Sequence, residues 1–428
     1  MDLARARMTR ARMSGAAPTP PRAPRVSGPA TLAARAAVTR SLADLPAGAR
    51  LLVACSGGPD SLALAVTVAH ASAAAGWVPR ALVVDHGLRE GSAAEARDVV
   101  ARLDAIGLPA AAVRVRPDGG GGPENRAREA RWAALRAEAD GDLVLTGHTM
   151  DDQAETVLLG LARGSGARSL AGMREHDDGV RRPFLGLRRA QTLAVCAELD
   201  LEPVLDPTNA ADGPWRASDG SALRRAAVRD RALPALADAL GVDPVPALAR
   251  TAALHRRDDD ELSAQAERLL ADAAAAGRPA AGRGPADPSG TQGGAPGADP
   301  GVGRGHGRTD GDSPEAGHDV GREPGRTDGD APGAGADVGG GGRHETDGGG
   351  ADVILDAATL AAAPAAIRTR ALRSAGALAG WRPGDVKAAH VEGLDALVAA
   401  YSGQGPLALP GIEAWRSCGR LILGPRDD

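Results

Sequence analysis

The chain has 428 residues, of which 58 are Gly and 31 are Pro, and 43% are apolar. This Gly and Pro content is too high for one uniform globular fold, although the length allows two or three hydrophobic cores. There are 50 basic and 55 acidic residues, and Lys387 is the only lysine. Because Lys387 stands in RPGDVKAAH, the sequence excludes a Gly-rich phosphate loop that ends in lysine.

The three cysteines, Cys55, Cys196 and Cys418, lie far apart and form neither a CxxC motif nor a zinc-binding spacing. This pattern predicts a reduced, cytoplasmic protein. No apolar run approaches the roughly 18 residues that a membrane-spanning helix needs, so we expect a soluble protein.

Residues 1–30 are rich in Arg, Pro and Ala and lack the apolar region of a secretory signal. They predict a disordered leader. The alternatives are an organelle transit peptide and a true translation start further along, at Met8 or Met13.

Residues 31–214 alternate short apolar runs with stretches of helical pattern, and they predict one α/β domain. The expected strands are Leu51–Cys55, Ala81–Asp85, Ala111–Val115 and Asp142–Thr146. The expected helices are Thr31–Leu45, Ser61–Ala75, Ala93–Ile106 and Glu124–Ala139. Apolar strands separated by helices predict a Rossmann-like parallel sheet covered on both faces. Such sheets bind ligands at the carboxyl ends of their strands.

The rest of the chain divides into three parts by composition. Residues 215–276 have helical patterns and predict a helical extension. Residues 277–350 hold 25 Gly in 74 positions, with a tandem duplication of 307–324 in 325–342, and predict a disordered linker. A calcium-binding repeat is the alternative there, but the regular nonapeptide spacing is absent. Residues 351–428 regain apolar patterns and predict a small C-terminal domain.

A Gly-rich loop follows the first expected strand and leads directly into a helix. It consists of Ser56, Gly57, Gly58, Pro59, Asp60 and Ser61. The glycines let backbone N–H groups approach a phosphate, the serines add hydroxyl donors, and the helix N-terminus is positive. A carboxylate beside phosphates needs a cation between them, so we expect Asp60 to hold Mg²⁺. The alternative interpretation is an ordinary Gly-rich helix cap.

Two more motifs follow expected strands. DHGLR, residues 85–89, suits either a nucleotide contact or a surface loop. TGHTMDDQAET, residues 146–156, places Asp152 and Glu155 three residues apart, on one face of a helix N-terminus. Acidic residues in a first turn also complement the helix dipole. Because the same sheet carries the Gly-rich loop, we favour a site for a metal or a cationic substrate.

Arg131, beside Trp132, is a candidate for a contact with a nucleic-acid backbone, and Arg225 and Arg229 are candidates for binding phosphate. Arg128 and Arg131 lie on the expected helix Glu124–Ala139, and Arg225 and Arg229 belong to a later basic cluster. Guanidinium groups bind phosphate bidentately, which suits them to such contacts. A salt-bridged solvent face formed with Glu124 adequately explains Arg128.

In this order and at these spacings, the motifs resemble the tRNA(Ile)-lysidine synthase family, a branch of the PP-loop ATP pyrophosphatases. The resemblance rests on SGGPDS, VDHGLR, the E-x-x-A-R-x-x-R-W helix, TGHTMDDQAET, RGSG, RPFLGL and DPTN. It covers about residues 50–235, and weaker similarity near residues 352–423 includes ALPGIEAWR.

The resemblance implies that ATP adenylates C2 of the wobble cytidine of tRNA(Ile) with a CAU anticodon, and that free L-lysine then displaces AMP. It implies that the Gly-rich loop cradles pyrophosphate, that Asp60 holds Mg²⁺, and that Asp152 and Glu155 bind the lysine ammonium. It further implies contacts with tRNA or the adenylated cytidine from the C-terminal domain and from Arg128, Arg131, Arg225 and Arg229.

Other activities of PP-loop proteins fit the sequence less well. Thiolation generally requires a reactive cysteine pair, which the three separate cysteines do not supply. GMP and NAD synthetases need an amidotransferase partner or domain. A non-catalytic tRNA-binding protein has no reason to keep Asp60, Asp152 and Glu155 together.

Overall fold

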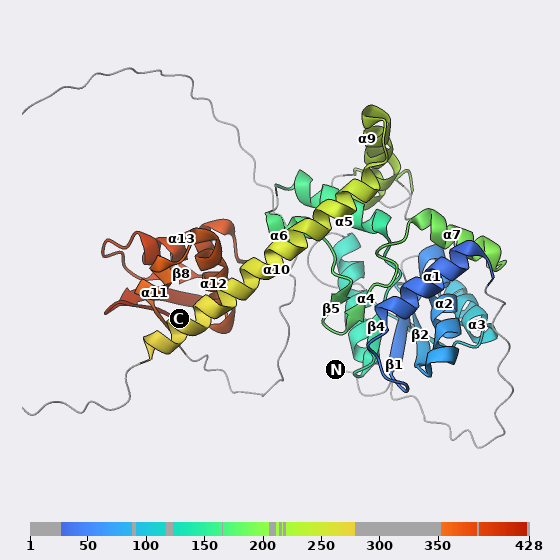
Figure 1. Cartoon of the computed structure of the whole chain (residues 1–428), viewed down its shortest axis with the longest axis horizontal. Helices are drawn as coiled ribbons and strands as arrows, with labels where there is room; N and C mark the ends of the chain where they lie inside the picture. The colour runs from blue at the N-terminus through green and yellow to red at the C-terminus, as the bar shows by residue number, and fades with distance from the viewer. Residues whose placement is uncertain are drawn as a thin grey trace, which may run out of the picture. The chain divides into compact units, whose positions relative to one another are not determined.

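The computed structural model describes residues 27–87, 91–116, 123–164, 166–204, 211–213, 216, 220–278, 352–382 and 385–425 (Figure 1). The expected leader up to residue 26, and the expected linker from residue 279 onward, lie outside these ranges. The described chain forms two compact units that divide between Ala264 and Gln265, inside the helix α10 (Pro244–Gly277).

The first unit is an α/β domain followed by helices. Its strands are β1 (Arg50–Ala54), β2 (Val78–Asp85), β3 (Ala110–Arg114), β4 (Leu143–Leu145), β5 (His176–Asp177) and β6 (Val180–Arg181). Its helices before α10 are α1 (Pro29–Ser41), α2 (Pro59–Ala75), α3 (Ser92–Ala105), α4 (Pro123–Ala139), α5 (Met150–Ala162), α6 (Ala167–Leu170), α7 (Arg189–Glu198), α8 (Arg224–Ala227) and α9 (Leu233–Leu240). A π-helical turn, Val228–Ala232, joins α8 to α9.

The six strands of this unit form one sheet in the order β3-β2-β1-β4-β6-β5. All neighbours run parallel except the β5–β6 hairpin, and Val53 in the central strand pairs with both Ala81 and Leu145. The predicted parallel α/β sheet is thereby confirmed, with β1 to β4 at the expected positions. β5 and β6 were not predicted, because two-residue strands are too short to show an alternating pattern.

Side chains of β1 alternate between two cores, as the pleat of a strand requires. Leu51 and Val53 pack with α1, α2, α3 and α7 on one face of the sheet. Leu52 faces the other side, where it packs with Leu135 and Ala139 of α4. Figure 1 shows α1, α2 and α7 gathered together beside the strands. The expectation that helices cover both faces is confirmed.

The parallel strands place several motifs at one edge of the sheet. The Gly-rich loop follows β1, residues 146–149 follow β4, and Arg182 follows β6. Because parallel strands end on the same side, these segments meet above the carboxyl ends of β1, β4 and β6.

The second unit combines a small sheet with helices. Its elements after α10 are β7 (Val353–Asp356), α11 (Ala357–Ala362), α12 (Ala365–Leu378), α13 (Ala388–Ala399), β8 (Leu407–Leu409), β9 (Ile412–Ser417) and β10 (Arg420–Pro425). The sheet is antiparallel, in the order β7-β10-β9-β8. Ala266 and Ala273 of α10 belong to its hydrophobic core together with Leu372 and Leu421. The end of α10 is therefore part of this unit.

The longest helix, α10, has 34 residues and carries charged side chains on both halves. In the first unit, Arg256 donates hydrogen bonds to the carbonyl oxygens of Ala171 and Met173 at 2.9 and 2.7 Å. Within the described ranges no single helix is both long and apolar enough to cross a membrane, and one bent pair, Arg224–Leu240 with Pro244–Gly277, reaches those criteria only jointly.

Candidate active site

Hydrogen bonds within the Gly-rich loop (Ser56–Ser61) hold its shape. The Ser56 N–H donates to Oγ of Ser61 at 3.1 Å, and the Ser61 hydroxyl donates to the Gly58 carbonyl at 3.0 Å. Gly57 adopts a φ of +80°, and a Cβ added there would lie 2.5 Å from a methyl group of Val99. Only glycine fits that position without strain. The loop is thus formed in advance, at the positive N-terminus of α2.

The start of α5 is fixed by a reciprocal cap between Thr149 and Asp152. Oδ2 of Asp152 accepts hydrogen bonds from the backbone N–H and the hydroxyl of Thr149, both at 2.8 Å. The Thr149 hydroxyl in turn accepts from the backbone N–H of Asp152. This capping box leaves Oδ1 of Asp152 pointing away from the cap. Glu155 lies one turn further on, and its side chain is completely buried.

Three predicted site residues meet at one guanidinium group, that of Arg189. Its Nε lies 3.3 Å from Oδ2 of Asp60, its Nη2 lies 2.8 Å from Oδ1 of Asp152, and its Nη1 lies 3.3 Å from Oε1 of Glu155. Asp60, Asp152 and Glu155 are called the acidic triad below. The structure therefore brings the carboxylate of the Gly-rich loop together with the two carboxylates of α5.

Arg189 is held in place through its backbone. Oδ2 of Asp151 accepts a hydrogen bond from the Arg189 N–H at 2.8 Å, and Oδ1 of Asp151 lies 3.1 Å from Nη2 of Arg188. One turn later in α7, the Thr192 hydroxyl donates to Oδ1 of Asp60. Asp151 thus anchors the start of α7, a role outside the acidic triad.

The sequence interpretation missed Arg189 and Thr192, although one signal was present. Arg188 and Arg189 stand together at the N-terminus of α7, whose first turn contains no acidic residue. A helix dipole disfavours positive charge at that end. Two arginines there require carboxylates from other segments, which Asp151 and the acidic triad supply.

Burial and neighbouring charges together set the ionisation of the carboxylates in the site. Burial raises the pKa of Asp60, and the hydrogen bond from Thr192 and the charge of Arg189 offset this only in part. Burial also opposes ionisation of Asp152, but Arg189 and Thr149 outweigh it and lower the pKa of that carboxyl. Although Arg189 also loses hydration, the acidic triad raises its pKa above the ordinary value. Asp152 and Arg189 are therefore a charged pair at neutral pH.

Two of the four arginines predicted to contact tRNA have partners in α5. Arg229 grips Glu155 bidentately, with Nε 2.7 Å from Oε1 and Nη2 3.2 Å from Oε2. Arg225 donates from Nη2 to the hydroxyl of Thr156 at 3.2 Å. Arg229 thus supplies the second counter-charge of buried Glu155, which the sequence did not predict.

The half-buried imidazole of His148 lies among arginines next to the acidic triad. Its Nδ1 is 2.9 Å from the Thr146 hydroxyl. Loss of hydration lowers the pKa of His148 to about 3; the charge of Asp152 opposes this shift, whereas Arg131 and Arg182 add to it. His148 is therefore neutral at pH 7 and adds no positive charge beside Asp152.

Arg131 on α4 has lost much of its hydration. Its Nε is buried without a hydrogen-bond partner, and its guanidinium carbon lies 5.9 Å from the centre of the Trp132 ring. Desolvation, together with the charges of Arg128 and Arg225, lowers the pKa of Arg131 to about 10. Arg128 is exposed on the same helix. This group of positive charges has the character of an anion site.

Two cysteines lie beside the Gly-rich loop, and both are buried free thiols. Burial raises the pKa of Cys55, and burial together with the charge of Asp60 raises the pKa of Cys196 to about 11. Because the thiolate is the nucleophile in sulfur chemistry, neither side chain is prepared for it at neutral pH.

Some predicted features lie outside the described residues. They are Arg89 of DHGLR, the side chain of Glu124, Ser165 of RGSG, and DPTN at 206–209.

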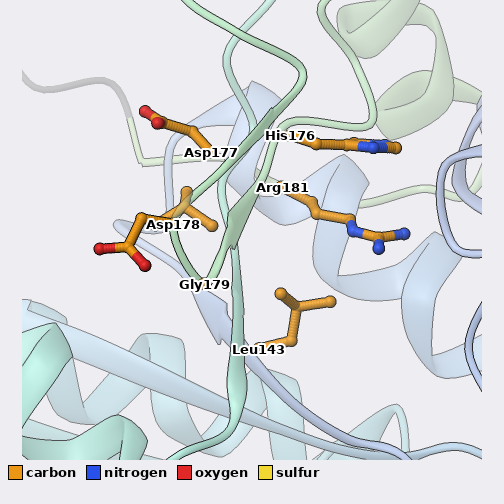
Figure 2. A pocket seen from close by; sticks show the side chains of 7 residues that line it. Leu143, His176, Asp177, Asp178, Gly179 and Arg181 are labelled. Atoms are coloured by element: carbon orange, nitrogen blue, oxygen red, sulfur yellow. The ribbon is translucent and has the colours of Figure 1, made fainter. Parts of the chain in front are cut away.

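A separate shallow pocket lies at the β5–β6 hairpin (Figure 2). In Figure 2, Asp177 and Asp178 point to one side of the hairpin, and His176 and Arg181 point to the other. Leu143, at the amino end of β4, also lines the pocket. It therefore lies away from the carboxyl ends of the strands, and it contains no predicted site residue.

Comparison with known families gives two matches. Residues 32–236 match the PP-loop domain model, and residues 355–422 match the TilS substrate binding domain model. The first match contains the Gly-rich loop, the acidic triad and Arg189. Among solved structures, the U34-tRNA thiolase NcsA from Methanococcus maripaludis is similar with a TM-score of 0.43 and 17% identity, over 54% of this chain and 78% of that chain.

Three curated relatives share one name. The chain is 39% identical to the tRNA(Ile)-lysidine synthase of Thermobifida fusca, over 89% of this chain and 93% of that protein. It is 37% identical to that of Streptomyces coelicolor, over 89% and 86%, and 52% identical to that of Mycolicibacterium paratuberculosis, over 54% and 68%. With this identity over nearly the whole length of a relative, the chain belongs to the tRNA(Ile)-lysidine synthase family.

Proposed function

We propose that this protein ligates L-lysine to C2 of the wobble cytidine of a tRNA(Ile) with a CAU anticodon, at the expense of ATP. The C2 oxygen attacks the α-phosphorus of ATP and pyrophosphate leaves; the lysine amine then attacks C2, and AMP leaves with that oxygen. The observation that supports the proposal is the acidic triad, because the two buried carboxylates proposed to bind the amine share a guanidinium partner with the carboxylate of the Gly-rich loop.

The Gly-rich loop is the expected site of the ATP phosphates. Ser56, Gly57, Gly58 and Pro59 lead from β1 into α2, so N–H groups of a helix N-terminus face the ligand. Mg²⁺ typically takes one or two carboxylates and completes its shell with phosphate oxygens and water. The described residues hold no cluster of three or more side chains that could bind a metal by themselves. Asp60, on the Gly-rich loop, is the carboxylate we expect beside a Mg²⁺ ion that arrives with ATP. Bound there, the ion would neutralise phosphate charge.

Asp152 and Glu155 are the expected partners of the lysine ammonium. An ammonium group withdrawn from water needs anionic partners, and both carboxylates are almost fully buried. Attack on C2 requires the free amine, so the bound ammonium must release a proton at this step. We propose that this proton passes to one of the two carboxylates that hold the ammonium.

The arginines beside the triad are the expected contacts for tRNA. Arg131 and Arg225 both lie close enough to His148 to lower its pKa, and Asp152 lies close enough to raise it. Positive groups therefore lie near the carboxylates proposed to bind the amine. Guanidinium groups there suit a backbone phosphate or the phosphate of the adenylated cytidine. Arg128 and Arg229 remain predicted tRNA contacts, although Arg229 must also neutralise Glu155. The 355–422 match supports tRNA binding by the second unit.

The test incubates the full chain with labelled L-lysine, ATP, Mg²⁺ and a transcript of tRNA(Ile) with a CAU anticodon. We expect label in the tRNA, with one AMP and one pyrophosphate released for each lysine. The matched control is the same transcript with uridine at the wobble position, which should take up no label. Sulfur transfer to the tRNA, or tRNA binding without lysine incorporation, would overturn the proposal.

A further inference from the structure

Arg189 contacts carboxylates to which the proposed function gives two different tasks. Asp60 belongs with the nucleotide, whereas Asp152 and Glu155 belong with the amine of lysine. The same guanidinium group reaches all three, with contacts of 3.3, 2.8 and 3.3 Å. Arg189 therefore links the carboxylate of the Gly-rich loop to the two carboxylates of α5.

With Arg189 in this position, the amine pair is already occupied. Oδ2 of Asp152 accepts from Thr149, and its Oδ1 accepts from Arg189. Both oxygens of Glu155 accept from Arg229, and Oε1 also accepts from Arg189. A lysine ammonium brings three more donors and another positive charge to the same oxygens. Lysine and the Arg189 guanidinium therefore compete for one pair of carboxylates.

Arg189 has the features of a side chain that can change partners without unfolding the helix. Its backbone is anchored by Asp151, and its side chain is 21% exposed. Its Nε contact points to Asp60, the residue that the Gly-rich loop contributes to the triad. A phosphate bound at that loop offers the planar guanidinium of Arg189 a bidentate partner, whereas each carboxylate of the triad gives it a single contact.

We propose that Arg189 is a positioning residue that blocks Asp152 and Glu155 until a nucleotide draws its guanidinium toward the Gly-rich loop, so that nucleotide binding admits lysine. This inference rests on the proposed function, which assigns lysine to that pair. The two ligands are then thermodynamically coupled, and each raises the affinity for the other by the same factor. In the absence of nucleotide, the Arg189 guanidinium occupies Asp152 and Glu155, so free lysine binds weakly.

The test measures the dissociation constant of L-lysine by calorimetry on the full chain, with and without α,β-methylene-ATP, which cannot release pyrophosphate. For the unmodified protein we expect the analogue to tighten lysine binding by about tenfold, within the usual range of coupling between sites. In Arg189→Gln we expect lysine to bind without nucleotide as tightly as the unmodified protein binds it with nucleotide. The analogue should then change lysine affinity less than twofold.

Arg188→Gln is the matched control, because Arg188 stands at the same helix end and contacts Asp151 and Asp243 rather than the triad. It should keep the full coupling. Arg189→Lys serves if the Gln variant does not fold: a single ammonium cannot bridge three carboxylates, so coupling should fall without vanishing. Coupling of unchanged size in either Arg189 variant, or weaker nucleotide-free lysine binding by Arg189→Gln, overturns the inference.

Failure of the inference and failure of the proposed function give different results. If lysine binds the unmodified protein equally well with and without the analogue, and Arg189→Gln changes nothing, Arg189 is no barrier and lysine ligation still stands. If lysine binds under no condition and no label enters tRNA, the proposed function falls, and this inference falls with it.

Discussion

Asp60 and Glu155 belong to the same triad, but their positions assign them different steps. Asp60 is on the Gly-rich loop and is partly exposed, whereas Glu155 is fully buried between Arg189 and Arg229. We expect Asp60→Asn to abolish the adenylated tRNA, because it removes the carboxylate proposed to hold Mg²⁺.

We expect Glu155→Gln to raise the lysine concentration needed for half-maximal rate at least tenfold. The lysine ammonium then loses one charged hydrogen-bond partner, which costs about 1.4 kcal/mol or more of binding free energy.

Both variants are measured by two assays, adenylate formation without lysine and lysine incorporation at increasing lysine. Gln keeps the shape of Glu155, so its effect is not that of a cavity. Near-normal adenylation by Asp60→Asn refutes the metal assignment. If Glu155→Gln needs the same lysine concentration for half-maximal rate as the unmodified protein, Glu155 does not bind the lysine ammonium.

His148 predicts how stability depends on pH. The folded state holds its pKa near 3, below the ordinary 6.5, so only the unfolded chain takes up a proton between those values. Stability is complete above about pH 6.5 and falls as the pH decreases, by at most about 1.4 kcal/mol per pH unit from this residue. Asp152, also with a lowered pKa, adds a loss of the same sign at lower pH, and Asp60, with a raised pKa, opposes it.

The measurement is urea unfolding between about pH 7 and pH 5 for the unmodified protein and for His148→Asn, whose amide can keep the bond to Thr146. Both proteins carry the same charged neighbours, Asp152, Arg131, Arg182 and Arg225, so the difference in slope isolates the imidazole. We expect the variant to have the shallower slope. Equal slopes would show that His148 takes up its proton equally in the folded and unfolded states.

At the scale of elements, the site depends on the close approach of α2 to the segment between β4 and α5. A Cβ added at Gly147 would lie 2.8 Å from the carbonyl oxygen of Asp60 and 3.1 Å from the backbone N of Ser61. Neither backbone atom can yield without moving the first turn of α2. We expect Gly147→Ala to reduce lysine incorporation about 100-fold, since misplacement by about 1 Å has effects of that size.

Gly186→Ala is the matched control for this prediction, because an added methyl group there meets no atom within 4 Å. It should incorporate lysine at the normal rate. Thermal unfolding of both variants separates a displaced site from a loss of the fold. If Gly147→Ala is fully active, the site does not depend on the close approach of α2 to the segment between β4 and α5.

The predicted elements differ in how far the sequence determined them. The strands β1, β2 and β4 were predicted because buried parallel strands are continuous apolar runs with clear ends. The edge strand β3 is also an apolar run, although its residues are exposed or half-buried. The cap of α5 was visible in TGHTMDDQAET as an acidic first turn, and the structure gives Asp152 both that capping role and a place in the triad. The helix α7 carries Arg189 but was not predicted, since its start lacks an acidic residue and breaks the usual pattern of charge.

At the scale of the whole molecule, the Gly-rich stretch accounts for the net charge. Residues 277–350 contain 7 Arg and 12 acidic residues, a net of −5, which equals the formal charge of the entire chain. The remainder has equal numbers of basic and acidic residues, so the net negative charge of the chain belongs to this stretch. The backbone on either side of this stretch is close in space: a Cβ at Gly277 would lie 2.8 Å from the Ile354 carbonyl oxygen.

We therefore expect that replacing residues 281–350 with about six Gly and Ser residues leaves lysine incorporation within twofold and stability within about 0.5 kcal/mol, because a short loop closes that gap at low entropic cost. The contrasting deletion also removes residues 266–278, and with them Ala266 and Ala273 from the second core. Only this larger deletion should unfold the second unit in thermal unfolding. Severe loss of activity in the smaller deletion would show that residues 281–350 do more than connect the two units.

The sequence alone determined the sheet, the Gly-rich loop and the pairing of Asp152 with Glu155, because these follow from spacings of a few residues and from the period of a strand or helix. Only the tertiary structure decided how the charges are shared. Arg189 reaches Asp60 across 129 positions of sequence, and Arg229 reaches Glu155 across 74. Such ion pairs arise when packing brings distant segments together, and no local pattern encodes them. The carboxylates that the sequence predicts as a site for a cation are, in the folded protein, already paired with Arg189 and Arg229.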